Sequence, residues 1–354
     1  MLTALEVENL RCIERARLEF DPNGTGIVGS NASGKTTLLE SIFFLSHGRS
    51  FRGGTREKLL RRGSERFRIV GDIARPAGMV TGGVEYSGDQ LKVRLAGQGI
   101  SGVSEIAEIL PTQVIDPGVH RLVEEGSARR RRLLDWGVFH VKHQFLAVWR
   151  RYQRALHQRN AALRSTTEGS VIGAWDAELA VSGSALDQER KAYVERLQPH
   201  FSGIAGRLLR LEVALSYRRG WPVELDLAAA LREAMPRDMR LKTTTVGAHR
   251  ADIVFRMDGE LARDRVSRGQ QKMLASSLIL AQMALRATET ADPVCLLLDD
   301  PAAELDVDNL GRLLSVINEI PAQIIATSVT NAGLRGMRIG RMFHVEQGRF
   351  TPML

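Results

Sequence analysis

The sequence predicts an α/β fold, in which a head of strands and helices contains an antiparallel β meander and an inserted, mainly helical lobe. Three observations lead to this prediction. An apolar strand, a glycine-rich loop and an apolar helical segment follow one another between Gly26 and Leu45, the order expected at the start of a parallel α/β unit. Residues 66–96 form short segments, several alternating, separated by turn residues, as in a meander. Residues 126–235 then follow a helical pattern, and strand-like sequence returns at 243–257.

The other elements follow from periodicity and turn residues in chain order. Two strands open the chain at residues 2–8 and 16–20, and the sequence after the lobe alternates between helix and strand. The later elements are a helix over 267–288, strand Val294–Leu298, helix Asn309–Ile317, strand Ile324–Thr327 and a final hairpin around Gly348. We therefore expect the head from residues 1–115 and 240–354, and the lobe from residues 116–239.

Composition narrows the class of protein. The 354 residues are 44% hydrophobic and contain no apolar run of membrane-spanning length. The first turn is acidic rather than basic and apolar, so we expect no signal peptide and a cytoplasmic location. Cys12 and Cys295 are far apart and form no CxxC pair, so neither a zinc site nor a disulfide is expected. The net charge of +8 suits a nucleic-acid partner, although an arginine-rich composition alone would also produce it.

The glycine-rich loop has the pattern G-x-x-x-x-G-K-[ST] of a nucleotide-binding P-loop. In this pattern successive backbone N–H groups and the following helix N-terminus face a phosphate. Lys35 would contact the β- and γ-phosphates of ATP, and the Thr36 hydroxyl would ligate Mg²⁺. The predicted nucleotide-binding residues are Gly29, Ser30, Asn31, Ala32, Ser33, Gly34, Lys35, Thr36 and Thr37.

A second element must hold the metal. The apolar strand from Val294 ends in Asp299 and Asp300, which is the form of a Walker B motif. Asp299 would reach Mg²⁺ through a water molecule, and Asp300 would orient or deprotonate the attacking water. An ordinary core strand with an acidic turn would explain the apolar run but not the paired carboxylates.

The spacing of the two motifs indicates the subclass. Lys35 and Asp299 lie 264 residues apart (299 − 35), more than a minimal P-loop domain needs. Just before the second motif, Ser267, Arg268, Gly269 and Gln270 open a helix, and this run resembles the signature of ABC-type ATPases. Ser267 would cap the helix and Gly269 would let a phosphate approach. The resemblance implies that the signature acts on the ATP of a second copy, so that ATP holds a homodimer together.

Two weaker assignments depend on order along the chain. Residues 302–306, with Glu304 and Asp306, are similar to the D-loop that follows Walker B in ABC-type ATPases. Gln113, between the meander and the lobe, stands where a Q-loop glutamine would sense Mg²⁺ and the γ-phosphate. Thr327 occupies the switch position that is His in transporters, so a role for it is weakly supported.

The motif set resembles the RecF family of SMC/ABC-related ATPases over nearly the whole chain. The supporting runs are residues 6–11, 48–52, 131–140, 158–163 and 247–252. Departures from the general ABC pattern are Val266, Ala303 and Asp300. The resemblance implies a slow, DNA-stimulated ATPase of recombinational repair and replication restart, which binds duplex or gapped DNA, works with RecR and RecO, and helps to load RecA.

Two alternatives share the ATPase core. An ABC transporter motor would carry a switch His and a Walker B Glu, and this chain has Thr327 and Asp300 instead. A chromosome-structuring SMC or Rad50-like protein would need long heptad arms, whereas the insert is broken by Gly and Pro.

A cationic stripe in the lobe is the predicted DNA-binding surface. Residues 126–164 hold ten Arg or Lys against the single acid Asp135, and such a stripe would bind phosphates without sequence preference. The residues proposed for DNA contact are Arg150, Arg151, Arg154 and Arg159. A solvated helical face is the competing interpretation.

Overall fold

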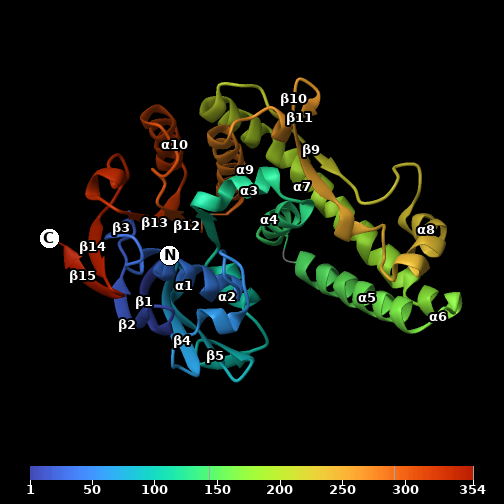
Figure 1. Ribbon diagram of the computed structural model, residues 1–354, viewed down its shortest axis with the longest axis horizontal. Coiled ribbons are helices and arrows are strands. Elements are labelled where there is room, and N and C mark those ends of the chain that lie inside the picture. The colour runs from blue at the N-terminus through green and yellow to red at the C-terminus, as the bar shows by residue number, and fades with distance from the viewer. Residues whose placement is uncertain (143, 291, 354) are drawn as a thin grey trace. The chain divides into compact units, whose positions relative to one another are not determined.

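The computed structural model describes residues 1–142, 144–290 and 292–353. The chain forms two compact units, one from Met1–Val119 with Ala287–Leu354 and the other from His120–Arg286. The α/β class with an antiparallel meander and a helical region is confirmed (Figure 1).

A six-stranded sheet of the first unit has the order β15-β14-β3-β13-β12-β8. Strands β8, β12, β13, β3 and β14 are parallel to their neighbours, and β15 is an antiparallel edge. The central strands are apolar and fully buried, as expected for a parallel sheet covered on both faces. The bounds are β3 Thr25–Val28, β8 Thr112–Ile115, β12 Val294–Asp299, β13 Ala322–Ser328, β14 Arg341–Glu346 and β15 Arg349–Met353.

The second sheet of this unit is antiparallel and has the order β2-β1-β4-β5-β6-β7. The predicted meander corresponds to β4–β6, and the two opening strands extend the same sheet. Helix α1, Lys35–His47, contributes Leu38, Ile42 and Phe44 to a core that also includes residues of both sheets. The bounds are β1 Leu2–Leu10, β2 Ile13–Glu19, β4 Arg66–Arg75, β5 Gly78–Ser87, β6 Gln90–Leu95 and β7 Gln98–Ile100; the helices are α1, α2 Ser104–Ile109 and α10 Val307–Glu319.

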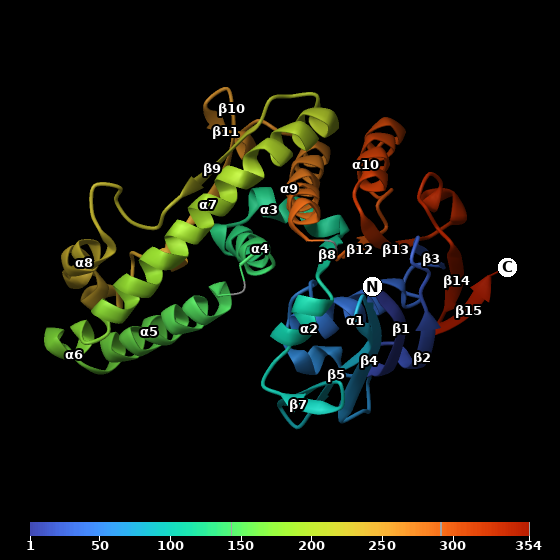
Figure 2. The same ribbon diagram turned by 180° about the vertical axis from the view of Figure 1, so that it is seen from behind.

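The second unit is mainly helical. Helix α5, Phe145–Ser165, packs along the 34-residue helix α7, Asp176–Leu209, and the two run side by side in both views (Figures 1 and 2). A three-stranded antiparallel sheet, β11-β10-β9, pairs Ala214–Arg218 with Asp252–Met257 and then Glu260–Leu261. The other helices are α3 Arg121–Glu124, α4 Ser127–Phe139, α6 Gly169–Gly173, α8 Leu227–Leu241 and α9 Arg268–Glu289.

The unit boundaries differ from the predicted domain boundaries at one end. The first division falls after Val119, close to the expected position near 115, but residues 240–286 belong to the second unit rather than to the head. The reason is strand pairing: β10 pairs with β9 of the helical unit, so the sequence around it folds with that unit. The strand-like segment predicted from 243 also begins later, at Asp252, because residues 243–251 form a loop and a short 3₁₀ turn.

Candidate functional site

The glycine-rich loop joins β3 to α1 in the first unit. Its turn is left-handed at Ala32 (φ 63°) and at Gly34 (φ 118°), and the second value lies in a region that favours glycine. Gly29 has a different requirement, because a Cβ there would overlap the Val345 carbonyl oxygen. The crest Ser30–Ala32 is exposed, whereas Ser33, Gly34 and Lys35 are buried. This backbone is compatible with the predicted P-loop.

Lys35 lies inside the curl of this loop. Its Nζ donates to the carbonyl oxygens of Gly29 at 2.7 Å and Ser30 at 2.8 Å. Burial lowers the pKa of Lys35, and the carboxylates of Asp300 and Asp299 oppose that shift. The ammonium group is thus held by carbonyl oxygens of the loop, and phosphate oxygens of a bound nucleotide could replace them.

Two further features of the loop fit a phosphate. The N-cap residue of α1 is Gly34, and no side chain caps the helix, so its first-turn amides have no side-chain acceptor. Ser33 Oγ is buried and has no hydrogen-bond partner in the described structure. Donors without acceptors at a helix N-terminus form an anion site.

The metal-binding pair predicted from sequence lies together. Thr36 Oγ1 donates to Asp299 Oδ1 at 2.9 Å and lies 3.0 Å from Oδ2. Thr327 Oγ1 donates to the same carboxylate at 2.8 Å. Burial raises the pKa of Asp299, and the hydrogen bonds from Thr327 and Thr36 act against that rise. A divalent cation between the Thr36 hydroxyl and Asp299 would offset the cost of burying this charge.

The residues around this pair fit Mg²⁺ better than a metal held by protein alone. No group of three or more His, Cys, Asp or Glu gathers as a metal site in residues 1–142, 144–290 and 292–353. Mg²⁺ usually takes one or two protein oxygens and completes its shell with phosphates and water. One hydroxyl and one carboxylate beside a phosphate-binding loop are sufficient for that coordination.

Asp300 follows β12 with a left-handed backbone, φ 46°. Its N–H is 3.2 Å from both the hydroxyl and the carbonyl oxygen of Thr327. The side chain is half-buried. Thr327 therefore fixes both aspartates, a role that the sequence indicated only weakly.

The position of Gln113 does not suit a Q-loop glutamine. Gln113 lies within β8 opposite Leu296, three residues before the level of Asp299. At about 3.3 Å per residue this is roughly 10 Å short of the carboxyl edge of the sheet. The error arose because β8 continues to Ile115, so Asp116 is the first residue beyond the strand. Asp116, which sequence reasoning missed, is the polar side chain at that edge.

The signature residues begin α9 in the second unit. Ser267 and Gln270 form a capping box: Gln270 Oε1 accepts from Ser267 N at 2.9 Å, and Ser267 Oγ accepts from Gln270 N at 3.4 Å. Arg268 contacts His120 Nε2 at 3.4 Å. A Cβ on Gly269 would meet nothing within 4 Å. Packing within the chain thus explains Ser267 and Gln270 but does not require glycine at 269.

The predicted D-loop residues are exposed at a turn after β12. Glu304 has a left-handed backbone, φ 65°. Asp306 is the N-cap of α10, and its Oδ1 accepts from Asn309 N at 2.7 Å. This backbone hydrogen bond lowers the pKa of Asp306. Asp306 therefore has a local structural role in addition to any contact with a second copy.

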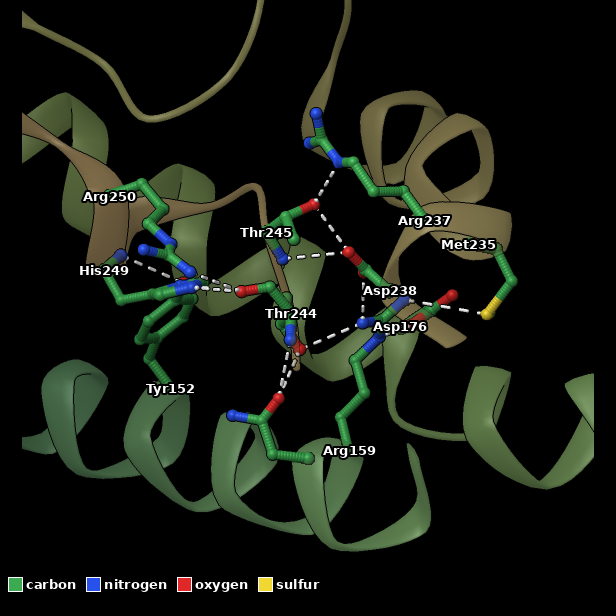
Figure 3. Close-up of polar contacts among 11 residues, drawn as sticks. Tyr152, Arg159, Asp176, Met235, Arg237, Asp238, Thr244, Thr245, His249 and Arg250 are labelled. Atoms are coloured by element: carbon green, nitrogen blue, oxygen red, sulfur yellow. Dashed lines mark hydrogen bonds and ion pairs between the residues drawn. The ribbon is translucent and has the colours of Figure 1, made fainter. Parts of the chain in front are cut away.

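The predicted DNA-binding arginines of α5 are not equivalent. Arg159 is fully buried and cannot reach DNA. Its guanidinium donates to Asp176 at 2.6 Å, to Asp238 at 2.7 Å and to Thr244 Oγ1 at 2.9 Å (Figure 3). The helical period that places Arg159 on the α7 side of α5 also places Arg150 and Arg154 on the exposed side. Arg151 is exposed and pairs with Glu178 at 2.8 Å.

Three of the runs that supported the family resemblance, 131–140, 158–163 and 247–252, lie among buried polar contacts of the second unit. Arg130 makes a bidentate pair with Asp252, at 2.8 and 3.0 Å, and Arg190 makes another with Asp135. His249 lies between the Tyr152 hydroxyl, 2.7 Å from Nδ1, and the Thr244 carbonyl, 3.0 Å from Nε2 (Figure 3). These contacts fix the loop before β10 against helices α4, α5 and α7. The arginines that make them therefore stabilise the interior of the helical unit and are not available to DNA at its surface.

No helix among the described residues combines the length and hydropathy needed to cross a membrane.

Comparison with known proteins agrees with this geometry. The profile described as RecF/RecN/SMC N terminal domain matches residues 1–351. The "DNA replication and repair protein RecF" of Thioalkalivibrio sulfidiphilus is 36% identical, over 98% of both chains. The protein of that name from a Marinomonas species is 37% identical, over 93% of this chain and 90% of its own.

Two solved structures extend the comparison. One, described as the recombination mediator protein RecF-ATP in the RecFOR pathway, superposes with a TM-score of 0.90 at 25% identity and covers 100% of this chain and 97% of its own. An SMC head bound to the C-winged helix domain of ScpA has a TM-score of 0.62 at 16% identity, covers 99% and 96%, and shows the shared fold alone.

Proposed function

The chain belongs to the RecF family, and from that premise we propose that it is an ATP-dependent DNA-binding protein of recombinational repair and replication restart. One observation supports this most strongly. Lys35, Thr36 and Asp299 converge beside a loop in which, within the described structure, the buried Ser33 hydroxyl has no hydrogen-bond partner and no side chain caps the first amides of α1. A magnesium-bound nucleoside triphosphate has the charge and the oxygen ligands that this arrangement lacks.

ATP would supply the phosphoanhydride bond that is cleaved. The chain would hold the phosphates and Mg²⁺ and would orient the attacking water. Lys35 and the amides at the start of α1 hold the phosphates, and Thr36 and Asp299 hold Mg²⁺. Asp300 orients or deprotonates the water, helped by its attachment to Thr327. The Asp300 side chain is one methylene group shorter than the glutamate common in transporters, so its carboxylate reaches less far towards the water, which suits slow turnover.

Nucleotide binding would be coupled to dimerisation. In this proposal the signature residues Ser267 to Gln270 complete the ATP site of a second copy, and ATP holds the two chains together until hydrolysis. Gly269 supports this part of the proposal, because a glycine in a helix costs about 1 kcal/mol relative to alanine and nothing in the chain itself fills the space.

DNA and protein partners complete the proposal. We expect sequence-independent binding to duplex or gapped DNA, and cooperation with RecR and RecO to load RecA. The solved RecF-ATP structure, described as that of a recombination mediator in the RecFOR pathway, supports the cooperation with RecR and RecO.

Gly269→Ala tests the dimer. The substitution should leave folding intact or slightly more stable, by up to about 1 kcal/mol, and leave ATP binding by the monomer unchanged. It should abolish ATP-induced dimerisation in sedimentation velocity, because the methyl group would occupy the space needed by the partner's phosphate. Gly203→Ala, an exposed glycine of α7 with equal open space, is the matched control. Lys35→Ala should lose both binding and dimerisation. A normal ATP-dependent dimer of Gly269→Ala would refute the proposed sandwich.

A further inference from the structure

A dense group of cations follows α1 in the first unit. Residues 49–68, here called the cationic loop, contain eight Arg or Lys against Glu57 and Glu65. Their net charge of +6 compares with +8 for the whole chain. The segment runs from the end of α1 through a 3₁₀ turn, Arg56–Leu59, into β4.

Three cations of this loop are available to an external anion. Arg56, Lys58 and Arg62 are exposed, and within the described structure none of them forms an ion pair with a carboxylate. Arg61, by contrast, pairs with Glu14 at 2.9 Å. Glu57 is engaged instead by Tyr86, whose hydroxyl donates to it at 2.6 Å.

The stripe on the second unit differs in this respect. Arg130, Arg151 and Arg159 pair with carboxylates of the same unit, and Arg129 does so with Glu125. Much of its formal charge is therefore neutralised internally. In sequence the stripe has the larger net charge, +9 against +6, but at least four of its ten cations pair with carboxylates in the described structure.

The start of the cationic loop is fixed to α1. Gly48 ends the helix in a left-handed conformation, with its N–H bonded to Phe44 O at 2.8 Å. Phe51 packs edge-on against Phe43, and Arg49 lies over the same ring at 5.8 Å. Ser50 Oγ donates to Glu40 and accepts from Arg52 N. Because the base of the loop is ordered, binding through it would cost less conformational entropy.

The surroundings of the cations favour a phosphate backbone over an acidic peptide. A peptide site needs buried apolar anchors, but no large hydrophobic side chain of residues 49–68 is exposed. Phe51 and Phe67 pack inward on Phe43 and Phe44, so no ring is offered for stacking on single-stranded bases. Seven of the eight cations are arginines, whose forked donors match phosphate oxygens. A Cβ on Gly53 or Gly63 would meet open space, so the backbone there can approach a phosphate chain closely.

We propose that the cationic loop is the surface of this chain that contacts the phosphate backbone of duplex DNA. The inference rests on the proposed function, because it locates the DNA contact within it. It moves the main contact from the lobe stripe to the unit that also holds the nucleotide site.

The test compares two triple variants of equal charge change in the full-length protein. One is Arg56→Ala/Lys58→Ala/Arg62→Ala, and the other is Arg150→Ala/Arg151→Ala/Arg154→Ala. Arg52 is left unchanged because its charge acts on Asp299. The affinity for a duplex oligonucleotide, with ATP and Mg²⁺, is measured by fluorescence anisotropy between 50 and 300 mM salt. Three lost phosphate contacts should reduce the slope of log K against log salt by about 2.7, and weaken binding by up to about 500-fold at 0.1 M salt.

The outcomes separate the two proposals. A large slope change in the cationic-loop variant, with a smaller one in the lobe variant, supports the inference. An unchanged slope in the cationic-loop variant, in a protein that binds duplex, overturns it and leaves the proposed function standing. A wild-type protein without salt-dependent duplex binding defeats the proposed function itself. Tighter loop-dependent binding to anionic lipid vesicles or polyglutamate than to duplex would also overturn the inference. Arg56→Lys/Arg62→Lys, which keeps the charge, should bind within a few-fold of wild type and controls for misfolding.

Discussion

Arg159→Ala should destabilise the helical unit rather than weaken DNA binding directly. The substitution removes the guanidinium that joins α5 to Asp176, Asp238 and Thr244. Asp238 is fully buried, and leaving a buried charge unpaired usually costs 3–5 kcal/mol. Asp238 Oδ1 would keep its bonds from Thr245 N at 2.9 Å and Oγ1 at 2.6 Å. We therefore expect the lower end of that range, about 3 kcal/mol.

The chain provides a probe for this unit alone. All four tryptophans, Trp136, Trp149, Trp175 and Trp221, lie between residues 120 and 286, so intrinsic tryptophan fluorescence follows the unfolding of the helical unit. For a domain of this size 1 kcal/mol shifts the melting temperature by about 2–4 °C. Arg159→Ala should therefore lower the fluorescence midpoint by roughly 6–12 °C.

Two further variants make the test specific. Arg154→Ala, five residues earlier on the exposed side of α5, should change the free energy of unfolding by no more than about 0.5 kcal/mol. Asp238→Asn introduced into Arg159→Ala should recover part of the loss, since it removes the unpaired charge. If Arg159→Ala had the same melting temperature as the wild-type protein but bound DNA poorly, the structural role of Arg159 would be refuted. Its predicted role in DNA binding would then be restored.

Two predictions concern titration and catalysis. Burial lowers the pKa of His249 from 6.5 to about 4, so between these values the unfolded chain binds a proton that the folded chain does not. The stabilisation present above pH 6.5 should therefore be lost as the pH falls towards 4, by on the order of 3 kcal/mol. His249→Asn should show a flatter tryptophan-fluorescence stability profile over that window, and an equally steep profile would contradict the assignment. Asp300→Asn should keep ATP-induced dimerisation in sedimentation but slow single-turnover hydrolysis by about 10²–10⁴-fold, the range for loss of a general base; unchanged hydrolysis would exclude Asp300 as the base.

The local geometry of the candidate nucleotide site could be predicted from sequence because each part is one continuous run in a defined context. The predicted P-loop follows a strand and precedes a helix, and Asp299 ends an apolar strand. In each case the secondary structure on either side determines where the functional side chain lies. The parallel sheet then brings Thr36 to within 2.9 Å of Asp299. Gln113 failed as a prediction because the length of β8 decides which residue reaches the sheet edge, and strand ends are poorly marked in sequence.

The surfaces could not be predicted in the same way. Ten cations in one segment give no indication of which ones have carboxylate partners, because those partners come from distant elements. Asp176 and Asp238 are 17 and 79 residues from Arg159, and only the packing of α5 with α7 and α8 reveals them. The boundary near 240 was missed for a related reason. Strand β10 pairs with β9, but helix α8 and its flanking loops separate the two strands in sequence.

The left-handed backbone at Asp300 limits which acids can replace it. Asp and Asn enter this conformation more readily than other non-glycine residues, whereas longer side chains meet a penalty of about 1–2 kcal/mol. Asp300→Glu is therefore not a conservative exchange, although it adds only one methylene group. A glutamate there would have to adopt the same left-handed backbone or loosen the turn held by Thr327, so a longer acid is expected to destabilise this turn. The backbone conformation of this one residue thus makes the length of its side chain and the geometry of the turn depend on each other.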